Sequence, residues 1–83
     1  MNIDLLIKMT NEISAYFAAE PDAEQAAQDV AVHLRRFWEP RMRRQIVAYY
    51  EERQGAGLSD LALRGVALLA AAEPPAAASA GPL

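Results

Sequence analysis

The chain has 83 residues, a formal net charge of −3 at pH 7 and no cysteine. Its length allows one small domain, and the lack of cysteine excludes disulfide bonds, thiolate metal sites and cysteine nucleophiles. The negative net charge argues against a dedicated nucleic-acid binder. No apolar run approaches the roughly 20 residues that a membrane helix needs, and the start, MNIDLLIKMT, lacks the basic region of a signal peptide. We therefore expect a cytoplasmic protein without a membrane segment.

The first predicted helix covers residues 3–19. Asn2 suits its N-cap, and Asp4 lies in the first turn, where the helix dipole favours an anion. Two apolar stripes run along this helix, offset by about a third of a turn. The second stripe has two interpretations, a well buried helix or a surface kept for a partner. The first stripe contains Ile3, Leu6, Ile7, Ile13 and Phe17, and the second contains Leu5, Met9 and Tyr16.

The second predicted helix follows Pro21. Asp22 and Gln25, three residues apart, resemble a capping box at its start. The helix is expected to end at Phe37 or Trp38. Apolar residues at helical spacing mark its inner face, and alanines among them would allow close packing. These residues are Ala26, Ala27, Val30, Leu34 and Phe37.

The third predicted helix covers residues 40–53 and begins at Pro40. Proline has no N–H and disfavours a helical Glu39, so it ends the second helix, and it suits the first position of a new one. Trp38, at this corner, is either part of the core or an anchor for a partner. The apolar face of the third helix comprises Met42, Ile46, Tyr49 and Tyr50.

The sequence GAG at 55–57 predicts a helix stop and a turn. Ser59 would then cap a fourth helix, ended by Pro74 and Pro75. Residues 74–83 carry no charge and predict a flexible, disordered Ala/Pro-rich tail. The expected fold is all-α, a small bundle of three to four short helices at residues 1–73 followed by this tail. The buried side of the fourth helix should hold Leu61, Ala62, Val66, Leu68 and Leu69.

Positive charge is concentrated in one stretch of the chain. Residues 30–44 hold five arginines and one acidic residue, whereas residues 1–29 hold six acidic residues and one lysine. Such asymmetry indicates a partner surface. Arg35 and Arg36 are also explained by their place at the end of the second helix, where the dipole favours cations.

Three further arginines lie at the start of the third helix, where the dipole disfavours cations. Since three such violations are hard to attribute to stability, we expect a functional reason for Arg41, Arg43 and Arg44. One interpretation is an anionic partner, with Arg41 and Arg44 pointing away from the apolar face. The other is a solvated face paired with Glu51 or Glu52.

No catalytic, cofactor-binding or metal site is visible in the sequence. His33 is the only histidine and has no second ligand nearby, and GAG lacks the lysine of a phosphate-binding loop. The helix–Pro–helix corner resembles a helix-turn-helix. However, the third helix offers few Asn, Gln, Ser or Thr side chains to contact bases, and its acidic flanks would repel a duplex.

Two segments resemble a known family. MNIDLLIKMTNEISAYF, followed by HLRRFWEPRMRR, is similar to the delta subunit of cytoplasmic, NAD-dependent, molybdenum-containing formate dehydrogenases. The resemblance covers roughly residues 2–70, and RRFWEPRMR is its most specific element. It implies a non-catalytic accessory subunit with no cofactor of its own, which binds and stabilises the alpha subunit. In that family the alpha subunit carries bis-molybdopterin guanine dinucleotide and iron–sulfur clusters.

The resemblance suggests where that partner binds. The family-matching stretch is residues 35–43, and Arg44 follows it. Three alternatives stay open: a transient chaperone for molybdenum-cofactor insertion, a small nucleic-acid-binding helical module, and self-association when the partner is missing. The candidate partner-binding residues are Arg35, Arg36, Trp38, Arg41, Arg43 and Arg44.

Overall fold

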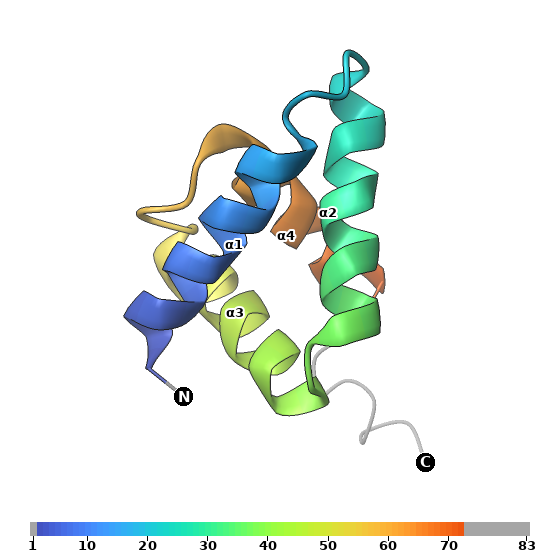
Figure 1. Cartoon of the computed structure of the whole chain (residues 1–83). Coiled ribbons are helices and arrows are strands. Elements are labelled where there is room, and N and C mark those ends of the chain that lie inside the picture. The colour runs from blue at the N-terminus through green and yellow to red at the C-terminus, as the bar shows by residue number, and fades with distance from the viewer. Residues whose placement is uncertain (1, 73–83) are drawn as a thin grey trace.

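Four helices form most of the computed structural model, which describes residues 2–72 (Figure 1). They are α1 (Ile3–Phe17), α2 (Ala23–Phe37), α3 (Pro40–Arg53) and α4 (Asp60–Ala72). Residues 2–72 contain no strand, which confirms the predicted all-α class with four short helices. The predicted helix end at Pro74 and Pro75 and the predicted tail at 74–83 lie outside the described residues.

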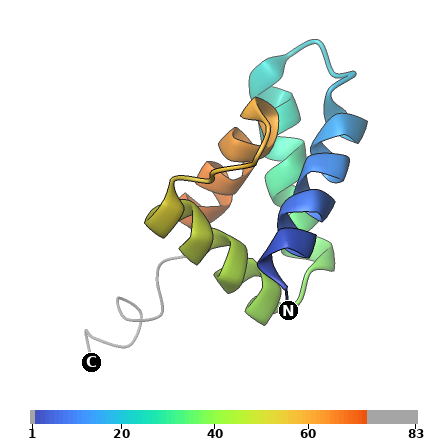
Figure 2. The ribbon, with the colours of Figure 1, turned by 90° about the vertical axis from the view of Figure 1, so that its left-hand side faces the viewer.

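The loop between α1 and α2 lies at the opposite end of α2 from the turn into α3 (Figure 1). α1 and α2 run antiparallel, and α4 packs along α2 in the closest helix–helix association of the described chain. Figure 2 shows α3 crossing the lower end of the other helices. Because α2 has 15 residues, the loop and the turn are separated by roughly 20 Å at 1.5 Å per residue.

Side-chain caps define three of the helix starts, as predicted. Oxygen atoms of Asn2 (2.8 Å), Asp22 (3.0 and 3.3 Å) and Ser59 (3.2 Å) accept hydrogen bonds from N–H groups in the first turns of α1, α2 and α4. The Gln25 amide donates to Asp29 at 2.9 Å instead of reaching back to the cap. The capping box at the start of α2 is therefore only half formed.

The predicted GAG stop ends α3. Gln54, Gly55 and Gly57 adopt left-handed backbone conformations, with φ of 58°, 70° and 92°. A side chain of α1 holds this loop in place: Asn11 Nδ2 donates to the Gly57 carbonyl at 3.0 Å, and its Oδ1 accepts from the Ser59 N–H at 2.8 Å. The turn into α4 is thereby fixed to a helix that lies more than forty residues earlier in the chain.

The core receives side chains from all four helices. Small residues on α2 and α4 allow these two helices to approach closely, as the alanines of α2 predicted. The approach is tightest at Gly65, where an added Cβ would lie 2.5 Å from Val30 Cγ1. The largest apolar side chains that are fully buried are Leu6, Val30, Leu34, Ile46, Val66 and Leu69.

Two residues predicted to be buried lie at the surface. Phe37 exposes 69% of its surface, because Trp38, where the backbone leaves the helix (φ −89°, ψ 143°), packs into the core beside Leu34 in its place. Leu68 is 39% exposed, because its neighbour Leu69 is the residue of α4 that faces the core. α1 also ends at Phe17, two residues before the predicted end.

Candidate functional site

The turn between α2 and α3, with the arginines around it, is the first part of the candidate site. We call residues 35–44 the corner. Trp38 ends α2 by donating its backbone N–H to the Leu34 carbonyl at 3.1 Å, and Pro40 begins α3 without a side-chain cap from Glu39. The Trp38 residue is only 6% exposed, which supports its interpretation as core packing. The buried tryptophan thus sets the position of the arginines that follow it.

Arg43 has a structural role that the sequence did not reveal. Its Nη1 donates hydrogen bonds to the carbonyl oxygens of Trp38, at 2.8 Å, and Arg35, at 3.2 Å. These carbonyls belong to the end of α2, where no further helical N–H is available to them. The expectation that Arg43 lacks a structural reason for its place is therefore wrong. Its guanidinium, at the start of α3, binds the carbonyl groups at the end of α2.

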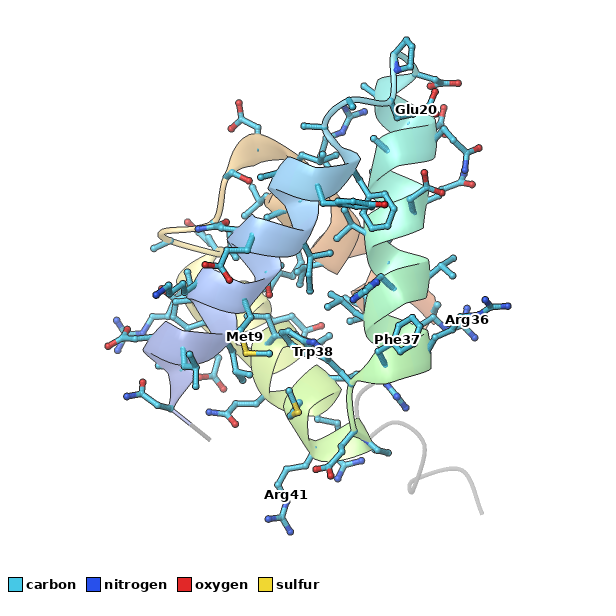
Figure 3. The ribbon with its side chains drawn as sticks, in the orientation of Figure 1. Met9, Glu20, Arg36, Phe37, Trp38 and Arg41 are labelled. Carbon is cyan, nitrogen blue, oxygen red and sulfur yellow. The ribbon has the colours of Figure 1, made fainter. Side chains whose placement is uncertain are left out.

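Arg41 and Arg44 differ from Arg43 because both are exposed. Within residues 2–72 neither side chain makes a hydrogen bond or an ion pair. The predicted alternative of pairs with Glu51 or Glu52 is therefore not found in this part of the chain. Figure 3 shows Arg41 extending away from the helices. Two guanidinium groups at the corner are thus open to solvent.

Arg35 and Arg36 complete the charge of the corner. Both lie in the last turn of α2 and are exposed, at the helix end that the dipole makes negative. Figure 3 shows Arg36 on the outer side of α2, next to Phe37. The corner therefore presents four exposed arginines. The helix dipole favours only two of them, Arg35 and Arg36.

An open groove between α1 and α2 forms the second part of the candidate site. Its volume is about 700 Å³, and its lining is mostly apolar. Figure 3 shows three of its lining residues, Met9, Trp38 and Phe37, at a similar height in the molecule. We refer to this second part as the groove. It is lined by Met9, Glu12, Ile13, Tyr16 and Phe17 of α1, by His33 and Phe37 of α2, and by Trp38.

A row of rings crosses the groove from α1 to α2. The ring of Tyr16 packs edge-on against Phe17 with centroids 5.0 Å apart, Phe17 lies 6.1 Å from His33, and His33 lies 4.7 Å from Phe37. The residues at the two ends of this row, Tyr16 and Phe37, are 78% and 69% exposed. Two large aromatic residues thus remain in water on one face, which is typical of an interaction surface.

The second stripe on the first helix is partly exposed. Leu5 and Tyr16 are exposed and Met9 is half-buried, so the interpretation as a fully buried helix is wrong. Sequence reasoning missed the part of α2 in this surface. A signal was present, since His33 and Phe37 are four residues apart and therefore neighbours on one helix face.

Within residues 2–72 no group of three His, Cys, Asp or Glu side chains could hold a metal ion. None of the helices in this range is long and apolar enough to cross a membrane.

Comparison with known proteins identifies a family. A family model described as NADH-dependent formate dehydrogenase delta subunit (FdsD) matches residues 5–66, which is most of the chain. The matched range contains the lining of the groove and the whole corner, including RRFWEPRMR. No match was found among curated proteins or among solved structures. The resemblance inferred from the sequence is thus confirmed, and the chain belongs to the family of NADH-dependent formate dehydrogenase delta subunits.

Proposed function

We propose that this chain is a non-catalytic, cytoplasmic subunit that binds and stabilises the alpha subunit of a NAD-dependent molybdenum formate dehydrogenase. Family membership makes it an accessory subunit that associates with other subunits of the complex. The alpha subunit, which carries bis-molybdopterin guanine dinucleotide in this family, is the partner we assign. In this proposal the chain has no cofactor of its own, and binding alone stabilises the folded partner by mass action.

The exposed arginines of the corner are the observation that carries the proposal. Arg41 lies in the first turn of α3, where the helix dipole opposes a cation, and Arg44 follows at the start of the second turn; within residues 2–72 neither side chain has an ion pair or hydrogen bond. A guanidinium offers forked donors that match a carboxylate or a phosphate. An acidic surface of the alpha subunit, or the phosphates of its cofactor, would therefore satisfy both groups.

The groove adds apolar contact area next to these charges. Burying a large aromatic side chain contributes about 1.5–3 kcal/mol, and Tyr16 and Phe37 are both mostly exposed in the isolated chain. Aromatic residues beside arginine are a common composition of interface hot spots. Binding of the alpha subunit would remove both rings from water.

Charge reversal at the corner tests the proposal. In cells that make both subunits, Arg41→Glu with Arg44→Glu should abolish co-purification with a tagged alpha subunit. The isolated variant should keep the helical circular dichroism of the wild type, because both side chains are exposed. The matched control is Arg53→Glu with Arg64→Glu, which makes the same charge change at exposed sites on α3 and α4 outside the corner. Unchanged binding of the corner variant, or an equal loss in the control, would reject the assignment.

A transient chaperone for insertion of the molybdenum cofactor is the second candidate. It would use the same corner, since cofactor phosphates are as suitable for Arg41 and Arg44 as carboxylates are. The two roles differ in the mature enzyme, where a subunit is stoichiometric and a chaperone is absent. A nucleic-acid-binding module would instead be retained on a DNA column and released as salt rises.

A further inference from the structure

The groove is an open surface depression between α1 and α2. α1 and α2 bury their inner faces against the core, yet their outer edges leave the groove open along the row of rings from Tyr16 to Phe37. Its lining carries only one formally charged side chain, Glu12. A small anionic ligand would find no arginine or lysine there. Because the groove is open and its lining is mostly apolar, it suits the apolar side chains of a docked protein segment.

The two ends of the groove carry opposite charge. At one end lies the corner, with four exposed arginines against Glu39. At the other end lies the α1–α2 loop, which leads into α2 with Glu20, Asp22 and Glu24, and no basic residue occurs between residues 18 and 32. Figure 3 shows Glu20 and Arg41 at opposite ends of the molecule, with Met9, Trp38 and Phe37 between their heights.

We propose that the groove binds an amphipathic helix of the alpha subunit, with acidic residues at the end beside the corner and basic residues at the end beside the α1–α2 loop. This inference rests on the proposed function, because the helix belongs to the alpha subunit. The apolar face of the helix would lie against Met9, Tyr16 and Phe37. Complementary charge at the two ends fixes which way the helix lies in the groove.

A helix suits this surface better than an extended peptide does. Residues 2–72 offer no strand edge to which an extended segment could add. Two antiparallel helices leave a long depression between them, and a third helix fills such a depression with side chains at positions i, i+3, i+4 and i+7.

A second copy of this chain is less suited to the same surface. Paired about a two-fold axis, two copies would bring one depression against another, because an isologous contact uses the same patch on both. A two-fold axis through the middle of the groove would also bring Glu12, which lies within the groove, towards its own symmetry mate. Like charges placed opposite each other disfavour such pairing.

Photo-crosslinking in the assembled enzyme tests the inference. The photoreactive amino acid p-benzoylphenylalanine replaces Tyr16 or Phe37, one at a time, in the complex purified through the alpha subunit. A third, control variant carries it at Leu68, which is exposed on α4 and does not line the groove. Crosslinks from the two groove positions should map to one segment of the alpha subunit with apolar residues at helical spacing. Probes at Arg41 and Glu20 should reach the acidic and the basic end of that segment.

The other outcomes separate the groove assignment from the proposed function. Crosslinks to a second copy, to residues 73–83 of the same chain, or to no protein while the complex stays intact would overturn the groove assignment and leave the proposed function standing. Failure of the wild-type chain to co-purify with the alpha subunit would overturn both.

A binding assay gives an independent check: Tyr16→Ala with Phe37→Ala should weaken binding to the alpha subunit by about tenfold or more. Leu68→Ala, which removes an exposed apolar group on α4, should change it by less than about twofold, and an effect equal to that of the groove variant would contradict the inference.

Discussion

The Arg43 guanidinium donates a hydrogen bond of 2.8 Å to the Trp38 carbonyl across the turn that joins α2 to α3. A second bond, of 3.2 Å, reaches the Arg35 carbonyl in the last turn of α2. One side chain from α3 thus satisfies the end of the preceding helix and sets how the two helices meet.

Removing this contact should destabilise the isolated chain. Arg43→Ala leaves two carbonyls at the end of α2 without the guanidinium, and a hydrogen bond to a charged group contributes about 1.5–3 kcal/mol. We expect the free energy of unfolding to fall by about that amount. Arg44→Ala, one residue away and exposed, should change it by no more than about 0.5 kcal/mol. Urea unfolding followed by circular dichroism measures both, and equal effects would show that the contact does not stabilise the fold.

Gly65 should be intolerant of the smallest side chain. Alanine favours an α-helix over glycine by about 1 kcal/mol, but at this position its Cβ would lie 2.5 Å from Val30 Cγ1 and 2.8 Å from Val30 Cβ. Because the clash lies in the tight contact between α2 and α4, we expect Gly65→Ala to lower the free energy of unfolding by about 1–3 kcal/mol.

A second substitution separates this clash from other causes. Val30→Ala removes the atom that the new Cβ would meet most closely, so it should reduce the effect of Gly65→Ala. In a double-mutant cycle, measured by thermal unfolding, the double variant should be more stable than the sum of the single effects predicts. Strict additivity would mean that the two residues do not compete for space.

Two adjacent aromatic residues should behave in opposite ways. Trp38→Ala should cost about 3–5 kcal/mol, since the residue is 6% exposed and belongs to the core cluster. Phe37→Ala should cost no more than about 1.5 kcal/mol, the upper end of the range for a ring contact such as the one with His33. Denaturant unfolding of the isolated variants checks both. A large loss for Phe37→Ala would contradict its assignment as a surface residue.

Helix boundaries were predictable where a residue type has a strict local preference. Asn2, Asp22 and Ser59 cap helices because their side-chain oxygens reach N–H groups of the first turn. Pro40 starts α3 and Gly55 helps to end it, and the predicted range 40–53 is the observed one. These features depend on one residue and its immediate neighbours, so the sequence contains all that determines them.

The aromatic positions around the corner depended on tertiary packing instead. After Leu34, both the third and the fourth following residue can return to the same helix face, and helical spacing does not decide between Phe37 and Trp38. The backbone leaves the helix at Trp38, which brings the larger ring into the core. The α2 side of the groove was missed for the same reason, because it depends on the exposure of Phe37.

The burial of two polar residues was a second feature that the sequence pattern did not predict. Thr10 and Ser14 are fully or almost fully buried on α1. Their hydroxyls donate to the carbonyls of Leu6, at 2.7 Å, and of Thr10, at 2.8 Å. Each donor is thus satisfied within its own helix, and a polar residue occupies a core position that the apolar pattern did not mark.

Native mass spectrometry tests most directly whether the chain is a stable subunit of the enzyme. The sample is a formate-oxidising complex, isolated from its own cells through a tag on the alpha subunit. We predict one copy of the 83-residue chain for each alpha subunit, with loss of that copy when Arg41→Glu and Arg44→Glu are combined. A fully active complex that lacks the chain, or a chain held by other subunits when the alpha subunit is absent, would contradict a resident subunit bound to alpha.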